Sequence, residues 1–281
     1  MGSSVSRGAQ LAAGWVIRRA LPGVRARLLA HWTTGGTALS RRRRWLFEGL
    51  SRAIDREYYR PAASTARREA LKALCMGEDA GVRWAKSYLA RGFPDRYTPI
   101  LAMFRELETY LAGGTVGRVH QVACCSGRET AYFARRFPAI AFRGSDGDAD
   151  VVAFLRSTWR GVPNLEFAHV RLERTDPGEM EALRSDLVYA SGGFHYLDER
   201  SLRRFLARVR EVTSIILLSQ PLDRAFSMEA HTRSTPRTQL SWNHPYARYL
   251  REAGWERVRW EEGVADELPW VKNVGVCAEA R

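Results

Sequence analysis

VHQVACCSGRETAYFARRF, residues 119–137, is the stretch of the sequence that decides the fold. Its first five residues form a short apolar run of the kind found in a buried strand. RETAYFARRF then places apolar residues three and four apart, as in a helix. The turn between them, ACCSG, is built from small residues, although two cysteines stand where glycines are expected. A strand, a tight turn and a helix in this order are the first half of a βαβ unit.

Short apolar runs alternate with helical patterns from this unit to the end of the chain. Strands are predicted at 119–123, 140–145, 165–169, 187–190 and 215–219, with a closing pair near 255–260 and 274–278. Such alternation is typical of right-handed βαβ crossovers. We therefore predict an α/β fold with a doubly wound, mostly parallel, seven-stranded Rossmann-like sheet, closed by an antiparallel edge.

A helical cap is predicted ahead of the sheet. Residues 45–112 show apolar residues three and four apart almost throughout, and AGG at 112–114 ends the last helix. TTGGTALS, residues 33–40, has the composition of a linker. The predicted parts are a basic segment at 1–40, partly disordered and partly amphipathic, a helical cap at 41–115 and a Rossmann-like domain at 116–281.

The formal charge of +13 is concentrated near the N-terminus. Residues 1–60 contain 12 arginines and three acidic residues, a net +9, which leaves +4 for the other 221 residues. Residues 9–32 combine apolar residues at helical spacing with arginines, which fits either peripheral contact with an anionic membrane or a helix packed on the domain. The same segment leaves open a nucleic-acid-associated role, although nucleic acid is not the expected partner.

The composition favours a cytoplasmic protein, with attachment to the inner face of a membrane as an extension of that hypothesis. No apolar run approaches the roughly 18 residues of a membrane span, and no secretory signal pattern is present. The four cysteines have neither disulfide-framework nor zinc-ligand spacing, so we expect reduced thiols and no metal site. GxxxxGK[ST] is absent, which argues against nucleotide hydrolysis.

The candidate site lies where the carboxyl ends of the strands meet the turn ACCSG. In doubly wound sheets a ligand binds there, at the point where the strand order reverses. Gly127 allows close approach of the backbone to a ligand at a helix N-terminus. Asp146 closes the second strand about 20 residues later, where a carboxylate can accept hydrogen bonds from both hydroxyls of a ribose.

Together, these motifs resemble the class I S-adenosylmethionine-dependent methyltransferase family over residues 116–281. GSDGDADVVAFL resembles its second motif, and SDLVYASGGFHYL its fourth. The resemblance implies that S-adenosyl-L-methionine is the cofactor. The cofactor-binding positions it implies are Gln121, Ala123, Cys125, Gly127, Asp146, Gly147, Arg171 and Ser191.

This chain departs from the family in the first motif. Gln121 replaces an acidic residue, so it supplies no charge to the cofactor's ammonium group. Ala123 and Cys125 replace two of three glycines, and the turn survives at modest cost if neither position needs a positive φ. Arg171 stands about where the family places an acid or amide beside the adenine. These departures leave open a non-catalytic, methyltransferase-like module.

Methyl transfer requires alignment of a nucleophile and, for a hydroxyl, a base. His195, after the fourth strand, is the first candidate base, and His244, between the fifth strand and the closing pair, is a weaker one. A histidine at the rim that only bonds the backbone is the structural alternative. The predicted function is methylation of a small-molecule or lipid-like acceptor at oxygen. The motif [DNS]PP[YFW] is absent, which argues against adenine methylation in nucleic acid, and the lack of a cysteine near residues 186–200 argues against cytosine C5 methylation.

Overall fold

The computed structural model describes residues 80–90, 98–237, 241–264 and 271–280. All of them except Ala80 belong to one compact unit, Gly81–Arg237 with Ser241–Arg281. The amphipathic segment at 9–32, the linker and most of the predicted helical cap therefore lie outside the described residues. None of the helices in the described ranges has the length and apolar character needed to cross a bilayer.

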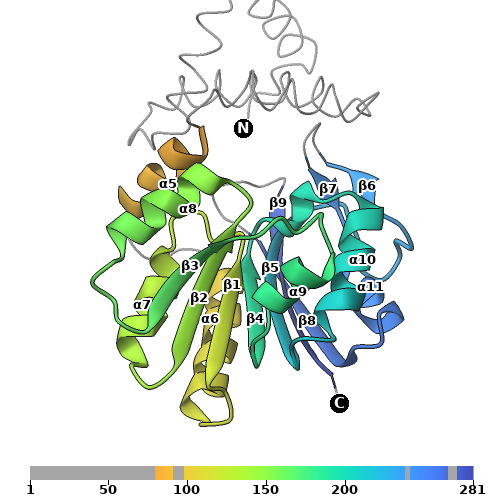
Figure 1. The fold of residues 1–281 in the computed structure, drawn as a ribbon. Coiled ribbons are helices and arrows are strands. Elements are labelled where there is room, and N and C mark those ends of the chain that lie inside the picture. Colours follow the sequence, from red (N-terminus) through yellow and green to blue (C-terminus); the bar gives the residue numbers. More distant parts are fainter. Residues whose placement is uncertain (1–79, 91–97, 238–240, 265–270, 281) are drawn as a thin grey trace, which may run out of the picture. The chain divides into compact units, whose positions relative to one another are not determined.

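One seven-stranded sheet organises this unit, in the order β3-β2-β1-β4-β5-β9-β8 (Figure 1). All ladders from β3 to β5 are parallel, and both ladders made by β9 are antiparallel. This arrangement confirms the predicted doubly wound sheet and its antiparallel edge. The strands are β1 (Arg118–Val122), β2 (Ala141–Asp146), β3 (Leu165–His169), β4 (Leu187–Ser191), β5 (Ile215–Asp223), β8 (Glu256–Val264) and β9 (Val271–Glu279).

Helices cover both faces of the sheet, and the central strands β1 and β4 are therefore buried on both sides. One apolar core joins the sheet to the helices that follow β3, β4 and β5, and two further apolar clusters join it to the other helices. Figure 1 shows the first set in front of the sheet and α6 behind it. The first set is α9 (Pro177–Ala182), α10 (Glu199–Val209) and α11 (Tyr246–Glu252); the others are α5 (Ala80–Ala90), α6 (Thr98–Ala112), α7 (Arg128–Arg136) and α8 (Ala149–Thr158).

The helix starts follow directly from the sequence. Asp148, Asp176 and Asp198 each accept a hydrogen bond from a backbone N–H of the first turn that follows. In α10 the buried residues Leu202, Phe205, Leu206 and Val209 recur at helical spacing, as the pattern predicts. One pair of strands was not predicted: β6 (Thr235–Pro236) and β7 (Trp242–Asn243) pair over two residues only, too short for any periodic signal.

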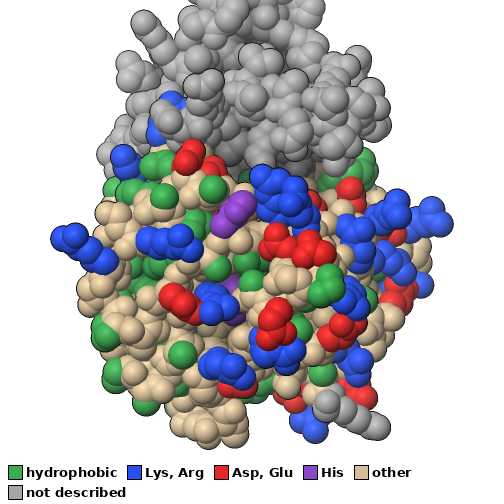
Figure 2. Space-filling model, in the orientation of Figure 1, with side chains coloured by type: hydrophobic (Ala, Val, Ile, Leu, Met, Phe, Trp, Pro, Cys, Tyr) green, Lys and Arg blue, Asp and Glu red, His purple; other side chains and the backbone are tan. Residues whose placement is uncertain are grey.

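Charges are interspersed on the face of the domain shown in Figure 2. Many arginines pair with acidic neighbours, for example Arg184 with Glu181 at 2.7 Å and Arg203 with Glu252 at 2.6 Å. Exposed pairs of this kind contribute little to stability. The pairing agrees with the nearly balanced charge of the sequence after residue 60. The face shown in Figure 2 therefore carries mixed charges and no continuous basic stripe.

Candidate active site

The β1–α7 turn has a left-handed backbone at three alternate positions. The φ angles are +52° at Ala123, +50° at Cys125 and +62° at Gly127. Ala123 and Cys125 therefore both have a positive φ, so the replacement of glycine at these two positions is not the low-cost change that the sequence left open. The turn nevertheless keeps its shape, with Cys124 N–H donating to the Ser145 carbonyl at 2.8 Å and Gly127 N–H donating to the Cys124 carbonyl at 2.8 Å.

Gly127 is the position where only glycine fits. A Cβ there would lie 2.8 Å from the ring of Phe167 and 3.1 Å from Nε1 of Trp159. That indole N–H donates to the carbonyl oxygen of Ser126 at 2.9 Å and so fixes the end of the turn. Phe167 and Trp159 therefore pack against one side of the turn, and a ligand on the opposite side can approach the backbone of Gly127 closely.

Cys124 and Cys125, the two cysteines of the turn, lie in different environments. Cys124 is buried in a cluster with Phe167, and its Sγ would lie 3.1 Å from a Cβ built on Gly144, so the thiol packs toward β2. Cys125 is half-buried. The pKa of its thiol is raised to about 12, mainly by burial and then by the negative charges of Asp146 and Glu129. Both thiols are therefore protonated near neutral pH, and neither suits a nucleophilic role.

Asp146 lies at the carboxyl end of β2, bonded to the turn. Its Oδ2 accepts the backbone N–H of Cys125 at 3.0 Å, and its Oδ1 accepts that of Asp148 at 3.1 Å. Each oxygen keeps a further lone pair. Burial raises the pKa of this carboxyl, and backbone N–H groups, first that of Cys125 and then that of Asp148, oppose the shift. The geometry joins the end of β2 to the turn, as the prediction of a ribose site requires.

Gln121, at the end of β1, faces α7 and β4 within the domain. It is 1% exposed, and its Oε1 accepts hydrogen bonds from the hydroxyls of Thr130 and Tyr189, the latter at 3.1 Å. Its Nε2 donates to Oε2 of Glu129 at 3.4 Å. Glu129 was not among the residues predicted from the sequence, although its place in the first helical turn after Gly127 was a signal that could have identified it.

The ends of β2 and β3 meet beside this turn. Gly147 is exposed, and its carbonyl accepts Nε2–H of His169 at 3.1 Å. Arg171 is half-buried, and its backbone N–H donates to Glu179 at 3.3 Å. Ser191 is half-buried at the end of β4. The structure thus brings Gly147 and Asp146 to one edge of the sheet with the turn, while the cofactor roles of Gly147, Arg171 and Ser191 stay predictions.

His195 lies in the 3-10 helix η1 (Phe194–Tyr196), which follows Gly192 and Gly193 at φ +84° and +92°. Gln220 on β5 donates its Nε2–H to the carbonyl of Gly192 at 3.0 Å, which turns its Oε1 toward Nδ1 of His195 at 3.4 Å. An amide oxygen only accepts, so Nδ1 carries the proton and Nε2 keeps its lone pair. Burial, then the charge of Arg237, lowers the pKa of His195 to about 3.

His244 has a different environment from His195. It is 0% exposed, its Nδ1 bonds the Ser234 hydroxyl at 2.7 Å, and its Nε2 is buried without a partner in the described ranges. A ring with no exposed nitrogen cannot reach an acceptor without a rearrangement. The structure therefore favours His195 over His244 as the base.

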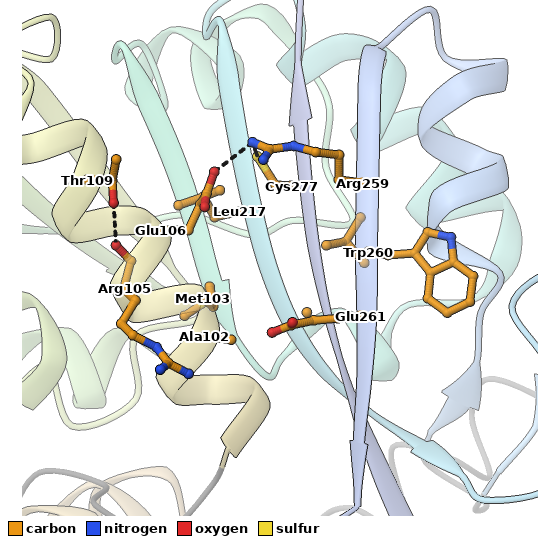
Figure 3. Close-up of a pocket in the computed structure, with 12 residues that line it drawn as sticks. Ala102, Met103, Arg105, Glu106, Thr109, Leu217, Arg259, Trp260, Glu261 and Cys277 are labelled. Carbon is orange, nitrogen blue, oxygen red and sulfur yellow. Dashed lines mark hydrogen bonds and ion pairs between the residues drawn. The ribbon is translucent and has the colours of Figure 1, made fainter.

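A cavity of about 370 Å³ lies elsewhere, between α6, β8 and β9 (Figure 3). Met103 and Leu217 contribute apolar surface, and Arg259 pairs with Glu106 at 2.7 Å across it. These residues lie in the middle of the strands and on α6, not at the carboxyl ends. The cavity shares no residue with the predicted cofactor or catalytic sets, so it is not the site described above.

Residues 119–214 match the sequence profile of a family described as the methyltransferase domain. This match runs from β1 to the residue before β5 and so includes the ends of β1, β2 and β4 that build the site. Residues 119–214 therefore form a methyltransferase domain, which agrees with the resemblance to the class I S-adenosylmethionine-dependent methyltransferases. Curated protein sequences give no match to the methyltransferase.

Solved structures resemble the methyltransferase in fold. The 1,6-didemethyltoxoflavin-N1-methyltransferase of Burkholderia thailandensis, solved with 1,6-didemethyltoxoflavin and S-adenosylhomocysteine, has a TM-score of 0.52 and 16% identity, over 79% of this chain and 92% of its own. The N-terminal domain of EvdMO1, solved with S-adenosylhomocysteine, has a TM-score of 0.51 and 18% identity, over 69% and 84%. At these identities the similarity shows the fold.

S-adenosyl-L-methionine is the cofactor of this family, and when bound it supplies a methyl group activated by a sulfonium. The residues at the carboxyl ends of the strands fit such a group. Gly127 leaves room for close approach at the start of α7, and Asp146 offers one free lone pair on each oxygen for the ribose hydroxyls. The buried thiol of Cys124 points to the sheet and does not fill this space.

Proposed function

We propose that the methyltransferase acts on a small organic molecule and methylates it at a hydroxyl oxygen. The observation that carries the proposal is the lone pair on Nε2 of His195. No hydrogen bond joins this atom to any residue of the described ranges, whereas Nδ1 is held by Gln220 at 3.4 Å. A neutral imidazole held in one tautomer can accept the proton that a hydroxyl loses when its oxygen takes a methyl group.

The low pKa of His195 narrows the class of hydroxyl. A ring with a pKa of about 3 is neutral at pH 7 but binds a proton weakly. It is therefore suited to an acidic hydroxyl, such as a phenol, rather than to an aliphatic alcohol. The charge of Arg237, whose side chain is 14% exposed, reaches His195 and would stabilise an oxyanion there. The bound small molecule of the Burkholderia enzyme supports a small acceptor for this fold.

A panel of small acceptors tests the chemistry. Phenols, each paired with the matching aniline, and long-chain alcohols as lipid-like acceptors are incubated with S-adenosylmethionine, and release of S-adenosylhomocysteine is measured. We expect turnover with phenols. Turnover only with the anilines would make the enzyme an N-methyltransferase and overturn the proposal, and turnover only with long-chain alcohols would favour the lipid-like alternative.

His195→Gln separates a base from a structural histidine. We expect kcat to fall about 100-fold, a typical contribution of a general base, with the affinity for S-adenosylhomocysteine unchanged. The matched control is His231→Gln, because His231 lies in the segment after β5 and its Nδ1 bonds Ser227 within its own turn. Equal loss of kcat in both variants would contradict a specific role for His195.

A further inference from the structure

The methyltransferase lacks a carboxylate at the end of β1, in the part of the site nearest the turn. Gln121 is uncharged, and its oxygen is engaged by Thr130 and Tyr189. S-adenosylmethionine and S-adenosylhomocysteine both carry an ammonium group on their amino-acid end. An ammonium group offers three donors and a full positive charge, which an amide N–H cannot neutralise. A negative charge near this end of the site must therefore come from another residue.

Glu129 is a carboxylate in the right place. It belongs to the first turn of α7, is 7% exposed, and lies beside Gln121, with 3.4 Å between its Oε2 and Nε2 of that residue. The charge of Glu129 acts across the turn on the thiol of Cys125. Burial is the first cause of the raised pKa of that thiol, and the charges of Asp146 and Glu129 are the next two. The same carboxylate adds to the effect of burial on the pKa of Tyr189.

The two oxygens of Glu129 have unequal partners. Oε1 accepts Nε–H of Arg128 at 3.2 Å, and the Nη1 of that arginine is anchored on the carbonyl of Tyr88 at 2.8 Å. Among the described residues, Oε2 has only the 3.4 Å contact with Gln121, longer than a strong charge-assisted hydrogen bond of about 2.7–2.9 Å. Arg128 therefore orients the carboxylate, while Oε2 keeps capacity for a cationic donor.

Stability alone is a weak reason to bury this carboxylate. Removing two charges from water costs several kcal/mol per ion, and a buried ion pair is often no better than an apolar pair of the same size. A second carboxylate, that of the half-buried Asp146, lies across the same turn and accepts the backbone N–H of Cys125. The site thus holds one acid at each side of the turn, which suits a ligand with a ribose at one end and an ammonium at the other.

We propose that Glu129 binds the ammonium group of the cofactor through Oε2, and that it supplies from α7 the charge that Gln121 does not supply from β1. This inference rests on the cofactor of the family and is independent of the acceptor proposed above. Arg128 acts as a positioning residue, because it touches Glu129 and holds its other oxygen.

Titration calorimetry with two ligands tests the proposal on the full chain. S-adenosylhomocysteine carries the amino-acid end, whereas 5′-methylthioadenosine has the same adenosine and a thioether without it. We expect Glu129→Gln to weaken S-adenosylhomocysteine at least tenfold and to leave 5′-methylthioadenosine within twofold. Glu181→Gln, an exposed glutamate on α9, is the matched control and should change neither affinity.

A rescue variant protects the test against a trivial effect on folding. In the Glu129→Gln background, Gln121→Glu should restore most of the affinity for S-adenosylhomocysteine, because it returns a carboxylate to the same pair of positions. Equal weakening of both ligands by Glu129→Gln, or unchanged binding of S-adenosylhomocysteine, would overturn the proposal. Absence of binding of both ligands to the unmodified protein would instead count against the cofactor itself.

Discussion

Asp146 is the residue predicted to bind the ribose, and both of its oxygens lie at the carboxyl end of β2 with one backbone donor each. Asp146→Asn keeps the size of the side chain but removes its charge and one acceptor oxygen. Hydrogen bonds to charged groups contribute about 1.5–3 kcal/mol, so we expect the affinity for S-adenosylhomocysteine to fall about 10- to 100-fold by calorimetry. Asp150→Asn changes an exposed carboxylate four residues later and should leave the affinity unchanged. Equal affinities of the Asp146→Asn variant and the unmodified protein would show that this carboxylate faces no ribose.

For single residues, the sequence predicted which positions lie at the site better than it predicted their hydrogen-bond partners. Asp146 was found because its distance from the turn is a property of the chain. The pairing of Gln121 with Glu129, and of His195 with Gln220, depends on side chains from different elements that meet only after folding. No periodic pattern carries that information, so the tautomer of His195 could be assigned only from the structure.

The β1–α7 turn is the element in which the chain departs most from its family. A left-handed backbone costs a residue with a Cβ roughly 1–2 kcal/mol, and Cys125 adopts φ +50°. Cys125→Gly should therefore increase the free energy of unfolding by about 1 kcal/mol, measured by urea denaturation, with the turn unchanged. Gly127→Ala should decrease it by about 2 kcal/mol or more, because the new Cβ would meet Phe167 at 2.8 Å. Gly161→Ala, with no atom within 4 Å of its Cβ, is the neutral control. A loss of stability in Cys125→Gly would show that the thiol contributes more packing than the backbone costs.

Among the elements, those with a strong period were the predictable ones. The parallel strands and the helices α7 to α11 follow from apolar runs and from aspartates at the helix starts, with ends that differ by a few residues at most. The strands β5, β8 and β9 are nine residues each, longer than predicted, because their pairing continues past the apolar run into polar residues. The pair β6 and β7 escaped prediction because a contact between two dipeptides is fixed by tertiary packing and not by local pattern.

At the scale of the whole described domain, three buried histidines make the stability depend on acidic pH. Burial lowers the pKa of His120, His195 and His244 to about 3 each, with nearby arginine charge as a further cause for the first two. In the unfolded chain a histidine has a pKa of about 6.5, so between pH 6.5 and 3 the unfolded state binds more protons than the folded state. The stability of the domain should therefore fall as the pH falls through this window.

The size of this loss can be tested with one histidine at a time. From pH 7 to pH 5, linkage gives a loss of about 2 kcal/mol of unfolding free energy for each buried histidine. His120 is the cleanest position, since it lies outside the proposed catalytic residues and bonds the Ser145 hydroxyl at 2.8 Å. His120→Gln keeps a partner for that hydroxyl but does not titrate. We expect this variant, measured by urea denaturation at the two pH values, to lose about 2 kcal/mol less than the unmodified protein. The same loss in both proteins would mean that His120 has nearly the same pKa in the folded and unfolded states, and that burial does not control its charge.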